Sequence, residues 1–237
     1  MTRFPKPGRR NLFRALLFVG PLNSEHRLIP FFMSSFYEQY WQERGKSGFR
    51  PRYKIFYDWI ESNASVLDIG CGDGYFGQVL VNKKNISYRG LDISETAVAM
   101  ARERGLVAEV CDASQDLNKF ADKSVDYVLM SEFIEHISNS EEVLKEARRI
   151  ARKAVLVSVP NIAYWKHRLE LLSGTFPRQW AFAPNEHLRF WSITDFIKTA
   201  DSLGFSSVNY KASNGKKILR EWWPNLFGFQ VCFLLKV

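Results

Sequence analysis

Glycine and aspartate are concentrated in one short stretch, VLDIGCGDGYFG at residues 66–77. It contains the pattern G-x-G-x-G at Gly70, Gly72 and Gly74 and, overlapping it, the pattern G-x-G-x-x-G, which runs from Gly72 to Gly77. Both patterns use glycine because the loop must turn sharply and let a cofactor approach the backbone without side chains. The stretch therefore predicts a cofactor-binding loop, and the residues around it must decide which cofactor.

The position of the first glycine separates the two interpretations. A dinucleotide loop begins with a glycine directly at a strand end, so that the pyrophosphate meets a helix N-terminus. If the dinucleotide pattern is taken to begin at Gly72, Gly70 and Cys71 form an extra turn that the pattern does not explain. A loop for S-adenosyl-L-methionine (SAM) needs a strand-end carboxylate and a loop around the aminoacyl part, which Asp68 and the following glycines supply. We predict SAM, with an NAD-linked oxidoreductase as a distant alternative.

Two more acidic residues follow the next predicted strands. Asp92 would bind ribose hydroxyls in either kind of enzyme. Asp112 and the backbone N–H of Ala113 could bind the amino group and ring nitrogen of adenine, although Asp112 alone could be an ordinary turn residue. Acids at three successive strand ends favour SAM.

Strands alternate with helices from residue 65 onward, which is typical of a parallel sheet wrapped by helices. We expect strands at 65–69, 87–91, 107–111, 125–130, 154–159, 207–211 and 230–236. Expected helices cover 75–82, 94–104, a segment opened by a capping box at Ser138 and Glu141 and ending near Arg152, and a segment from Ser192 to Gly204. Residues 161–191 are rich in aromatic side chains and follow a strand end, where open α/β sheets place ligands.

The segments VLDIGCGDG, GLDIS, CDASQDL, VDYVLMSEFIEHI and VSVPN resemble the successive motifs of class I SAM-dependent methyltransferases. EHLRFWSITDFIKTADSLGF resembles the closing segment of the small-molecule methyltransferases, and VPNIAYWKHRLELLSGTFP resembles the MetW-like branch. The resemblance implies an α/β fold with a Rossmann-like, doubly wound seven-stranded sheet, an antiparallel last strand and an aromatic cap insertion at about 161–191. The cofactor residues that it implies are Asp68, Gly70, Cys71, Gly72, Gly74, Asp92, Ile93, Asp112 and Ala113, with Tyr37 and Tyr40 from the covering segment FYEQYW.

Charge divides the chain into two parts. Residues 1–54 hold eleven basic and three acidic residues, which accounts for the whole net charge of +8. We expect residues 1–33 to be a basic extension, disordered or not translated, with a membrane-surface helix as a less favoured alternative, and residues 34–237 to be the methyltransferase domain. The neutral body argues against a nucleic-acid substrate, and no apolar run is long enough to span a bilayer.

Methyl transfer mainly requires positioning of the acceptor and exclusion of water. If the acceptor is a hydroxyl, His136 or His187 is the candidate base, because neutral imidazole titrates near pH 7. Glu132 and Glu135 flank His136, and we expect Glu135 to be solvated. Three widely spaced cysteines and four histidines without H-x-x-x-H spacing indicate a cytoplasmic protein and no metal.

Two functions remain open from the sequence. The favoured one is a SAM-dependent methyltransferase that acts on a small-molecule or saccharide-like acceptor. The alternative is a non-catalytic SAM-binding partner of a biosynthetic enzyme, which the MetW-like resemblance to a methionine biosynthesis protein allows. The oligomeric state is not predicted.

Overall fold

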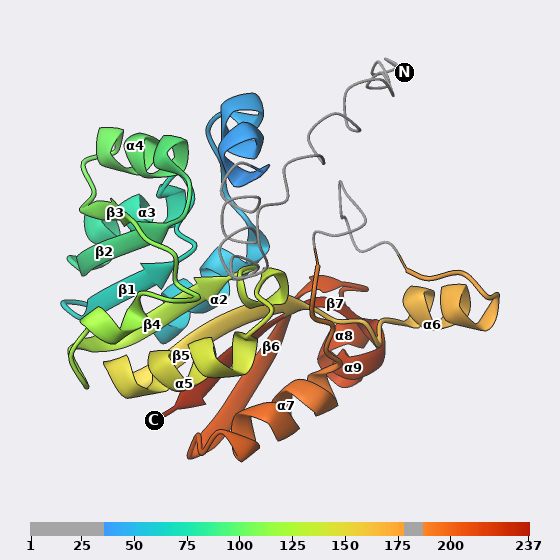
Figure 1. The fold of residues 1–237 in the computed structure, drawn as a ribbon. Coiled ribbons are helices and arrows are strands. Elements are labelled where there is room, and N and C mark those ends of the chain that lie inside the picture. Colours follow the sequence, from blue (N-terminus) through green and yellow to red (C-terminus); the bar gives the residue numbers. More distant parts are fainter. Residues whose placement is uncertain (1–35, 178–186) are drawn as a thin grey trace, which may run out of the picture.

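A seven-stranded sheet forms the centre of the computed structural model, which describes residues 36–177 and 187–237 (Figure 1). The strand order is β3-β2-β1-β4-β5-β7-β6. The strands are β1 (Ser65–Ile69), β2 (Ser87–Asp92), β3 (Ala108–Val110), β4 (Val125–Ser131), β5 (Ala151–Pro160), β6 (Ser207–Gly215) and β7 (Gly228–Lys236). The last strand, β7, pairs antiparallel with both β5 and β6, so the predicted Rossmann-like, doubly wound sheet is confirmed.

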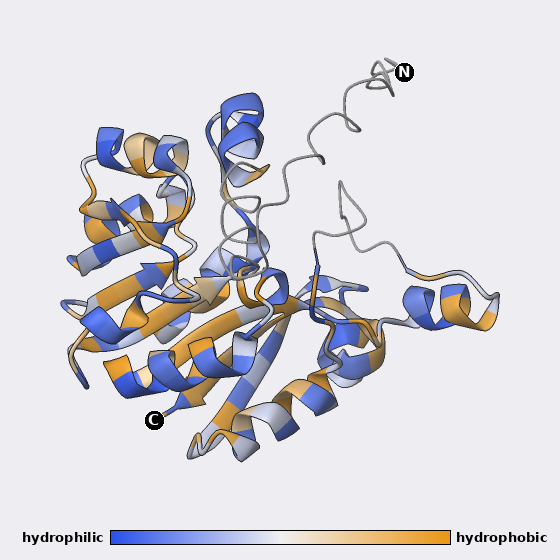
Figure 2. Ribbon diagram, in the orientation of Figure 1, coloured by the Kyte–Doolittle hydropathy of each residue, from blue (hydrophilic) through white to orange (hydrophobic). Residues whose placement is uncertain are grey.

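Helices cover both faces of the sheet because its central strands bury side chains on each side. On one face, α2 (Pro51–Trp59) and α3 (Tyr75–Lys84) contribute Phe56, Phe76 and Leu80 to a buried cluster. On the other face, α5 (Ser140–Ile150) and α7 (Ile193–Ser202) pack Leu144 and Phe196 against the sheet. Figure 2 shows the central strands as mostly hydrophobic, whereas α5 and α7 alternate hydrophobic and hydrophilic residues. Alternation of this kind buries one stripe of each helix.

The order of the strands reverses at β1. β2 and β3 follow on one side of β1, and β4 and β5 lie on the other, all four parallel to it within this part of the sheet. The connections leave β1 and β4 toward opposite faces, and open α/β sheets bind ligands at the carboxyl ends of strands beside such a reversal. The fold thus places the glycine loop and the segment after β4 at one edge.

Local signals fix several helix ends. Ser94 caps α4 (Glu95–Glu103), since its hydroxyl accepts a hydrogen bond from the Ala97 N–H, and Ser192 caps α7 in the same way through the Asp195 N–H. Both caps satisfy backbone donors that a helix leaves unpaired. Gly105 adopts a left-handed conformation (φ +81°) after α4, as predicted for a C-terminal cap.

The predicted capping box at Ser138 is wrong. Helix α5 starts two residues later, and its N-cap Asn139 makes no side-chain capping bond. The helix ends at Ile150 rather than near Arg152, because the backbone from Ala151 already pairs with β4. Extended pairing with a neighbouring strand therefore overrides the helical propensity of the basic residues there.

The segment after β5 contains helix α6 (Trp165–Leu172), which lies apart from the sheet in Figure 1. It belongs to the predicted aromatic cap insertion, whose residues 178–186 lie outside the described residues, as does the predicted basic extension at 1–33. Two short helices, α8 (Leu219–Trp222) and α9 (Pro224–Phe227), connect β6 to β7. Within 36–177 and 187–237, no helix is long and apolar enough to cross a membrane.

Replacement of Phe196 by alanine should lower the free energy of unfolding by about 3–5 kcal/mol, because the ring is fully buried between α7 and β7. Phe176→Ala is the matched control, since the Phe176 side chain is 59% exposed. That variant should change stability by less than about 1 kcal/mol. Urea unfolding followed by circular dichroism measures both. Equal losses in the two variants would contradict the described packing of α7.

Candidate functional site

Three glycines turn the chain between β1 and α3. Gly70, Gly72 and Gly74 all have left-handed backbones, with φ of +74°, +56° and +72°. A Cβ atom at Gly70 would lie 2.6 Å from the Phe133 ring, and one at Gly72 would lie 2.5 Å from the Trp41 ring. Backbone conformation and space therefore both require glycine here. Gly72 and Gly74 are buried and Gly70 is half-buried, so the loop is tightly packed, and its binding of a cofactor stays a prediction.

The Asp92 carboxylate connects the glycine loop to the next helix. One oxygen accepts a hydrogen bond from the Gly72 N–H at 2.9 Å, and the other accepts one from the Ser94 N–H at 3.0 Å. Burial is the largest influence on this group and raises its pKa, although the backbone N–H groups oppose that shift. When ionised, the two oxygens of Asp92 can accept further hydrogen bonds. The binding of a ribose by Asp92 and the adjacent Ile93 stays a prediction.

Asp68 lies beneath the loop rather than on its surface. Its side chain is buried, and one oxygen accepts a hydrogen bond from the Tyr88 hydroxyl at 2.8 Å. The other oxygen, Oδ1, has no hydrogen-bond partner among the described residues. Burial raises the pKa of Asp68 to about 7. A cationic group that reached Oδ1 would stabilise the ionised form.

Cys71 fills the space between the loop and β2. A Cβ atom at Gly90 would lie 2.7 Å from the Cys71 sulfur, so the thiol packs closely against that strand. Burial raises the pKa of the thiol well above its usual value. Cys71 therefore contributes packing to the loop and has little thiolate character.

Asp112 lies in a turn after β3. Its Oδ1 accepts hydrogen bonds from the Ser114 N–H at 3.0 Å and the Ser114 hydroxyl at 2.6 Å, and Oδ2 accepts one from the Gln115 side chain at 2.8 Å. This is the turn arrangement that aspartate commonly makes. Ala113 is buried beside it. The binding of adenine by this pair stays a prediction.

The helix over residues 36–44, blue in Figure 1, lies against the glycine loop. Glu38 anchors it to the start of α4, because its carboxylate accepts hydrogen bonds from the Ser94 hydroxyl at 2.7 Å and from the Thr96 N–H at 3.2 Å. Trp41 covers Gly72. The sequence pointed to Tyr37 and Tyr40 in this segment but missed Glu38 and Trp41, although the motif FYEQYW contains all four.

Asp73 is a second residue that sequence reasoning missed. Its carboxylate is almost fully buried and pairs with the Arg104 guanidinium at 2.6 Å. It also accepts a hydrogen bond from the Ser47 N–H at 2.6 Å. Arg104 donates a further bond to the Asp73 carbonyl at 2.8 Å. The glycine loop is thus tied to the end of α4, and no short motif signals this long-range contact.

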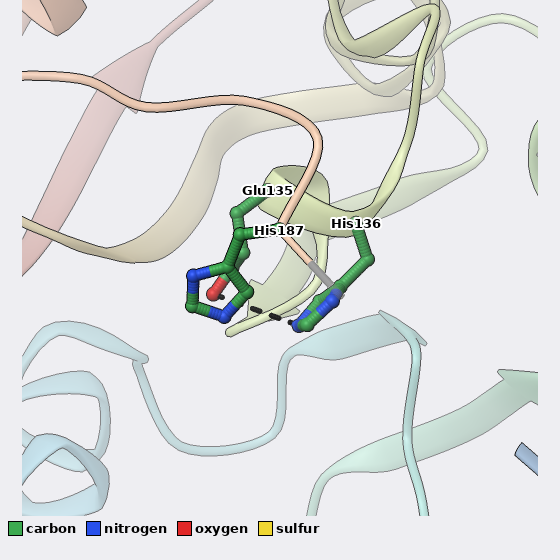
Figure 3. A group of neighbouring side chains, drawn as sticks. All are labelled: Glu135, His136 and His187. Atoms are coloured by element: carbon green, nitrogen blue, oxygen red, sulfur yellow. Dashed lines mark ion pairs between the residues drawn. The ribbon is translucent and has the colours of Figure 1, made fainter. Parts of the chain in front are cut away.

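The segment after β4 brings the two candidate histidines together. His136 belongs to the short 3-10 helix η2 (Ile134–His136), and His187 precedes α7. Their ring centroids are 4.8 Å apart, and Glu135 lies beside both (Figure 3). Burial lowers the pKa of His187, which favours its neutral form. The Tyr37 ring is 6.0 Å from the His136 ring, so the helix over 36–44 reaches this cluster.

The prediction of a solvated Glu135 is wrong. Its side chain is 1% exposed, because Ile134 anchors η2 in the core and directs the next residue inward. The contact between His136 and His187 could not be predicted from the sequence, because the two residues are far apart in the chain. The two segments meet because β4 and β5 are parallel neighbours whose carboxyl ends lie at the same edge, and because the Leu188 and Arg189 N–H groups bond to the Glu135 carbonyl.

Glu132 starts the turn between β4 and η2. Its backbone is left-handed (φ +56°), which is energetically costly for a residue other than glycine. The Glu132 N–H donates to the Ser158 carbonyl at 3.2 Å, which holds this turn against β5. Strained backbone of this kind clusters at functional sites. Glu132 itself is not part of the group formed by Glu135 and the two histidines.

A comparison with known protein families identifies the family of this chain. The family model described as "Methionine biosynthesis protein MetW" matches residues 50–235, which include the glycine loop and the whole described sheet except the last residue of β7. The chain belongs to the MetW family. The resemblance to class I SAM-dependent methyltransferases is thereby confirmed, and with it SAM as the cofactor of the group to which the chain belongs.

Two relatives of this MetW-family chain have different descriptions. It is 26% identical over 186 residues to a bifunctional methionine biosynthesis protein MetXA/MetW from Rhodopirellula baltica, covering 70% of this chain and 29% of that protein. It is 30% identical over 184 residues to a malonyl-[acyl-carrier protein] O-methyltransferase from Neorickettsia risticii, covering 66% of this chain and 72% of that protein. The chain thus spans less than a third of the Rhodopirellula protein.

Solved structures share the fold. A SAM-dependent methyltransferase from Archaeoglobus fulgidus superposes with a TM-score of 0.60 at 19% identity, covering 78% of this chain and 91% of that one. Magnesium protoporphyrin IX methyltransferase from Synechocystis gives a TM-score of 0.61 at 14% identity, covering 90% and 99%. At these identities the likeness establishes the fold of the MetW-family chain and leaves its acceptor open.

Asp68→Asn should change how stability depends on pH. The folded pKa of about 7 lies above the usual value of about 3.9, so the folded state binds more protons between these limits. The contribution of Asp68 to stability therefore falls as the pH rises from about 4 to about 7. The variant should gain about 2–4 kcal/mol relative to the natural protein over this interval. Urea unfolding at pH 5 and pH 8 measures the difference, and parallel pH profiles would contradict the buried carboxyl.

Proposed function

We propose that the chain is a SAM-dependent methyltransferase that transfers a methyl group to a small-molecule or saccharide-like acceptor. The observation that carries this proposal is the Asp92 carboxylate, which bonds the Gly72 N–H of the glycine loop and lies at the same sheet edge as His136 and His187. The proposed cofactor loop and a polar group that could face an acceptor therefore lie near each other at one edge of the sheet. This arrangement suits group transfer, which requires two bound reactants.

The residues present fit the three parts of SAM. Asp68 has a buried oxygen without a partner in the described chain, which suits the ammonium of the aminoacyl part. Asp92 and Ile93 would hold the ribose, and Asp112 and Ala113 the adenine. Gly70 and Gly72 would let the cofactor approach the backbone on the side where the Phe133 and Trp41 rings now lie, and Gly74 allows the turn into α3. Cys71 packs behind the loop against β2. When bound, SAM supplies an electrophilic methyl group on a sulfonium.

The chain itself would position the acceptor and exclude water. The helix over 36–44 covers the loop and is held by Glu38, so Tyr37, Tyr40 and Trp41 would close over the cofactor. Aromatic faces near a sulfonium add cation–π stabilisation. His136 or His187 would accept the proton of a hydroxyl acceptor, because burial keeps His187 neutral and able to act as a base.

The proposed acceptor class rests on the balance of charge and on the relatives. The body of the chain is electrically neutral, which does not favour nucleic acid. Among relatives, one is a malonyl-[acyl-carrier protein] O-methyltransferase, and another, 28% identical over 116 residues, is a norajmaline N-methyltransferase from Rauvolfia serpentina. Both names describe acceptors other than nucleic acid. A cytoplasmic location is part of the same proposal and is compatible with three free cysteines.

A second candidate function is that of a non-catalytic, SAM-binding partner of a biosynthetic enzyme. The observation that favours it is an exposed apolar surface at α8 and the residues beside it, where Ile218 and Trp222 are each 80% exposed and Trp223 is 52% exposed. Surfaces of this kind mark interaction sites. The match to a bifunctional protein of Rhodopirellula, in which this region is one part of a longer chain, points the same way.

Calorimetric titration with SAM, S-adenosylhomocysteine and NAD tests the cofactor site. The natural chain should bind both adenosyl ligands at micromolar concentration and should not bind NAD. Asp92→Ala should weaken binding at least about 100-fold, because it removes the ribose ligand and releases the Gly72 N–H. Asp201→Ala, on the exposed face of α7, is the matched control and should bind normally.

Absence of adenosyl binding by folded protein would overturn both candidate functions. Binding that Asp92→Ala leaves unchanged would remove Asp92 from the site. Formation of S-adenosylhomocysteine from SAM in the presence of fractionated small metabolites would support the methyltransferase. Tight SAM binding without any such formation would favour the partner protein.

A further inference from the structure

One carboxylate and two imidazoles meet at the carboxyl edge of the sheet, beside the cofactor loop. Glu135 and His136 come from η2, and His187 comes from the chain before α7 (Figure 3). One ligand atom from each of the three side chains lies within 4.8 Å of the others. Binding of SAM by the glycine loop requires none of these residues. Their convergence therefore needs its own explanation.

Burial makes this group different from a solvated acidic cluster. The Glu135 side chain is 1% exposed and the His136 side chain 15% exposed. Nδ1 of His187 is buried and makes no hydrogen bond within the described chain. In protein interiors, charged groups are paired with one another or coordinate metal ions, and a carboxylate between two imidazoles suits either arrangement.

Backbone hydrogen bonds hold the two segments at this distance. The Leu188 and Arg189 N–H groups donate to the Glu135 carbonyl at 2.8 Å and 3.1 Å. The Arg189 side chain donates from Nε to the Ser138 carbonyl at 3.1 Å. These bonds lie next to the three side chains in the sequence, so the main chain is fixed in place before any ligand arrives.

We propose that Glu135, His136 and His187 bind one divalent transition-metal ion, of the class of Zn²⁺, Mn²⁺ or Fe²⁺. Two imidazole nitrogens and one carboxylate oxygen form a donor set that these ions accept in proteins, whereas Mg²⁺ and Ca²⁺ prefer oxygen alone. Donors that surround such an ion lie about 3.0–3.5 Å apart. The Glu135 oxygen and the His136 Nε2 are 4.0 Å apart, so small side-chain rotations would close the group around the ion.

The role of the ion rests on the proposed methyltransferase function. Three protein ligands leave positions open, which an acceptor oxygen could occupy, and this favours an oxygen acceptor such as a hydroxyl. Metal binding lowers the pKa of a hydroxyl, which then loses its proton to water. A lone pair of that oxygen forms the bond to the methyl carbon, and the electron pair of the breaking carbon–sulfur bond stays on sulfur to give S-adenosylhomocysteine. Both histidines then act as ligands rather than bases.

The test uses the full chain after treatment with a chelator. Co²⁺ is titrated as an absorbing probe, and Zn²⁺ and Mn²⁺ are titrated by calorimetry. The natural protein should bind about one ion, with the visible absorption of nitrogen-ligated Co²⁺. Glu135→Gln and His187→Gln should each weaken binding at least about tenfold, because each removes one of three ligands. Glu142→Gln, on the exposed surface of α5, is the control and should bind as the natural protein does.

SAM titration of each variant distinguishes the two proposals. The metal site would be overturned if the natural protein bound no metal ion, or if Glu135→Gln and His187→Gln both bound metal as the natural protein does. Either result holds whether or not the protein binds SAM. Metal binding by natural protein that does not bind SAM would uphold the site and overturn the methyltransferase. If Glu135→Gln fails to fold, His187→Gln decides alone, since its side chain comes from a loop.

Discussion

The structure depends on the hydrogen bonds between the Asp92 carboxylate and the backbone at Gly72 and Ser94. A glycine loop has little intrinsic rigidity, because glycine gives up much conformational freedom when it folds. The carboxylate fixes the loop to the end of β2, and Ser94 passes the constraint on to α4 by capping that helix. Glu38 then attaches the helix over 36–44 to the same point. The Asp92 carboxylate thereby holds the glycine loop at the start of α4 and, through Ser94, at the helix over 36–44.

The elements whose signals are local could be predicted from the sequence. β1 begins and ends where the apolar run predicts, and α3 begins at Tyr75 directly after the last loop glycine. Ser192 caps α7 as its spacing from Asp195 indicates. Each signal involves residues within a few positions of one another. The capping box at Ser138 shows the limit, because the N-cap of α5 is Asn139 and makes no side-chain capping bond.

The parts of the site that could not be predicted depend on contacts between distant segments. Asp73 looks like an ordinary loop residue until Arg104 lies against it, and Glu135 looks like a surface residue until η2 turns it inward. The His136 and His187 rings meet only because the segment before α7 bonds to the Glu135 carbonyl. Acids that follow strands could be found by counting along the chain, whereas a pair of side chains from two separate loops could not.

The antiparallel strand β7 has a consequence for the order of assembly. β6 forms the edge of the described sheet and pairs with β7, while β7 alone connects it to β5. β7 follows both of these strands in the chain and therefore inserts between two that are made before it. While it is still inside the exit tunnel, β5 presents an unpaired edge and β6 has no neighbour in the sheet. Strand edges of this kind invite pairing with other chains, so the nascent chain is exposed to misassembly from the time β6 emerges until β7 follows it.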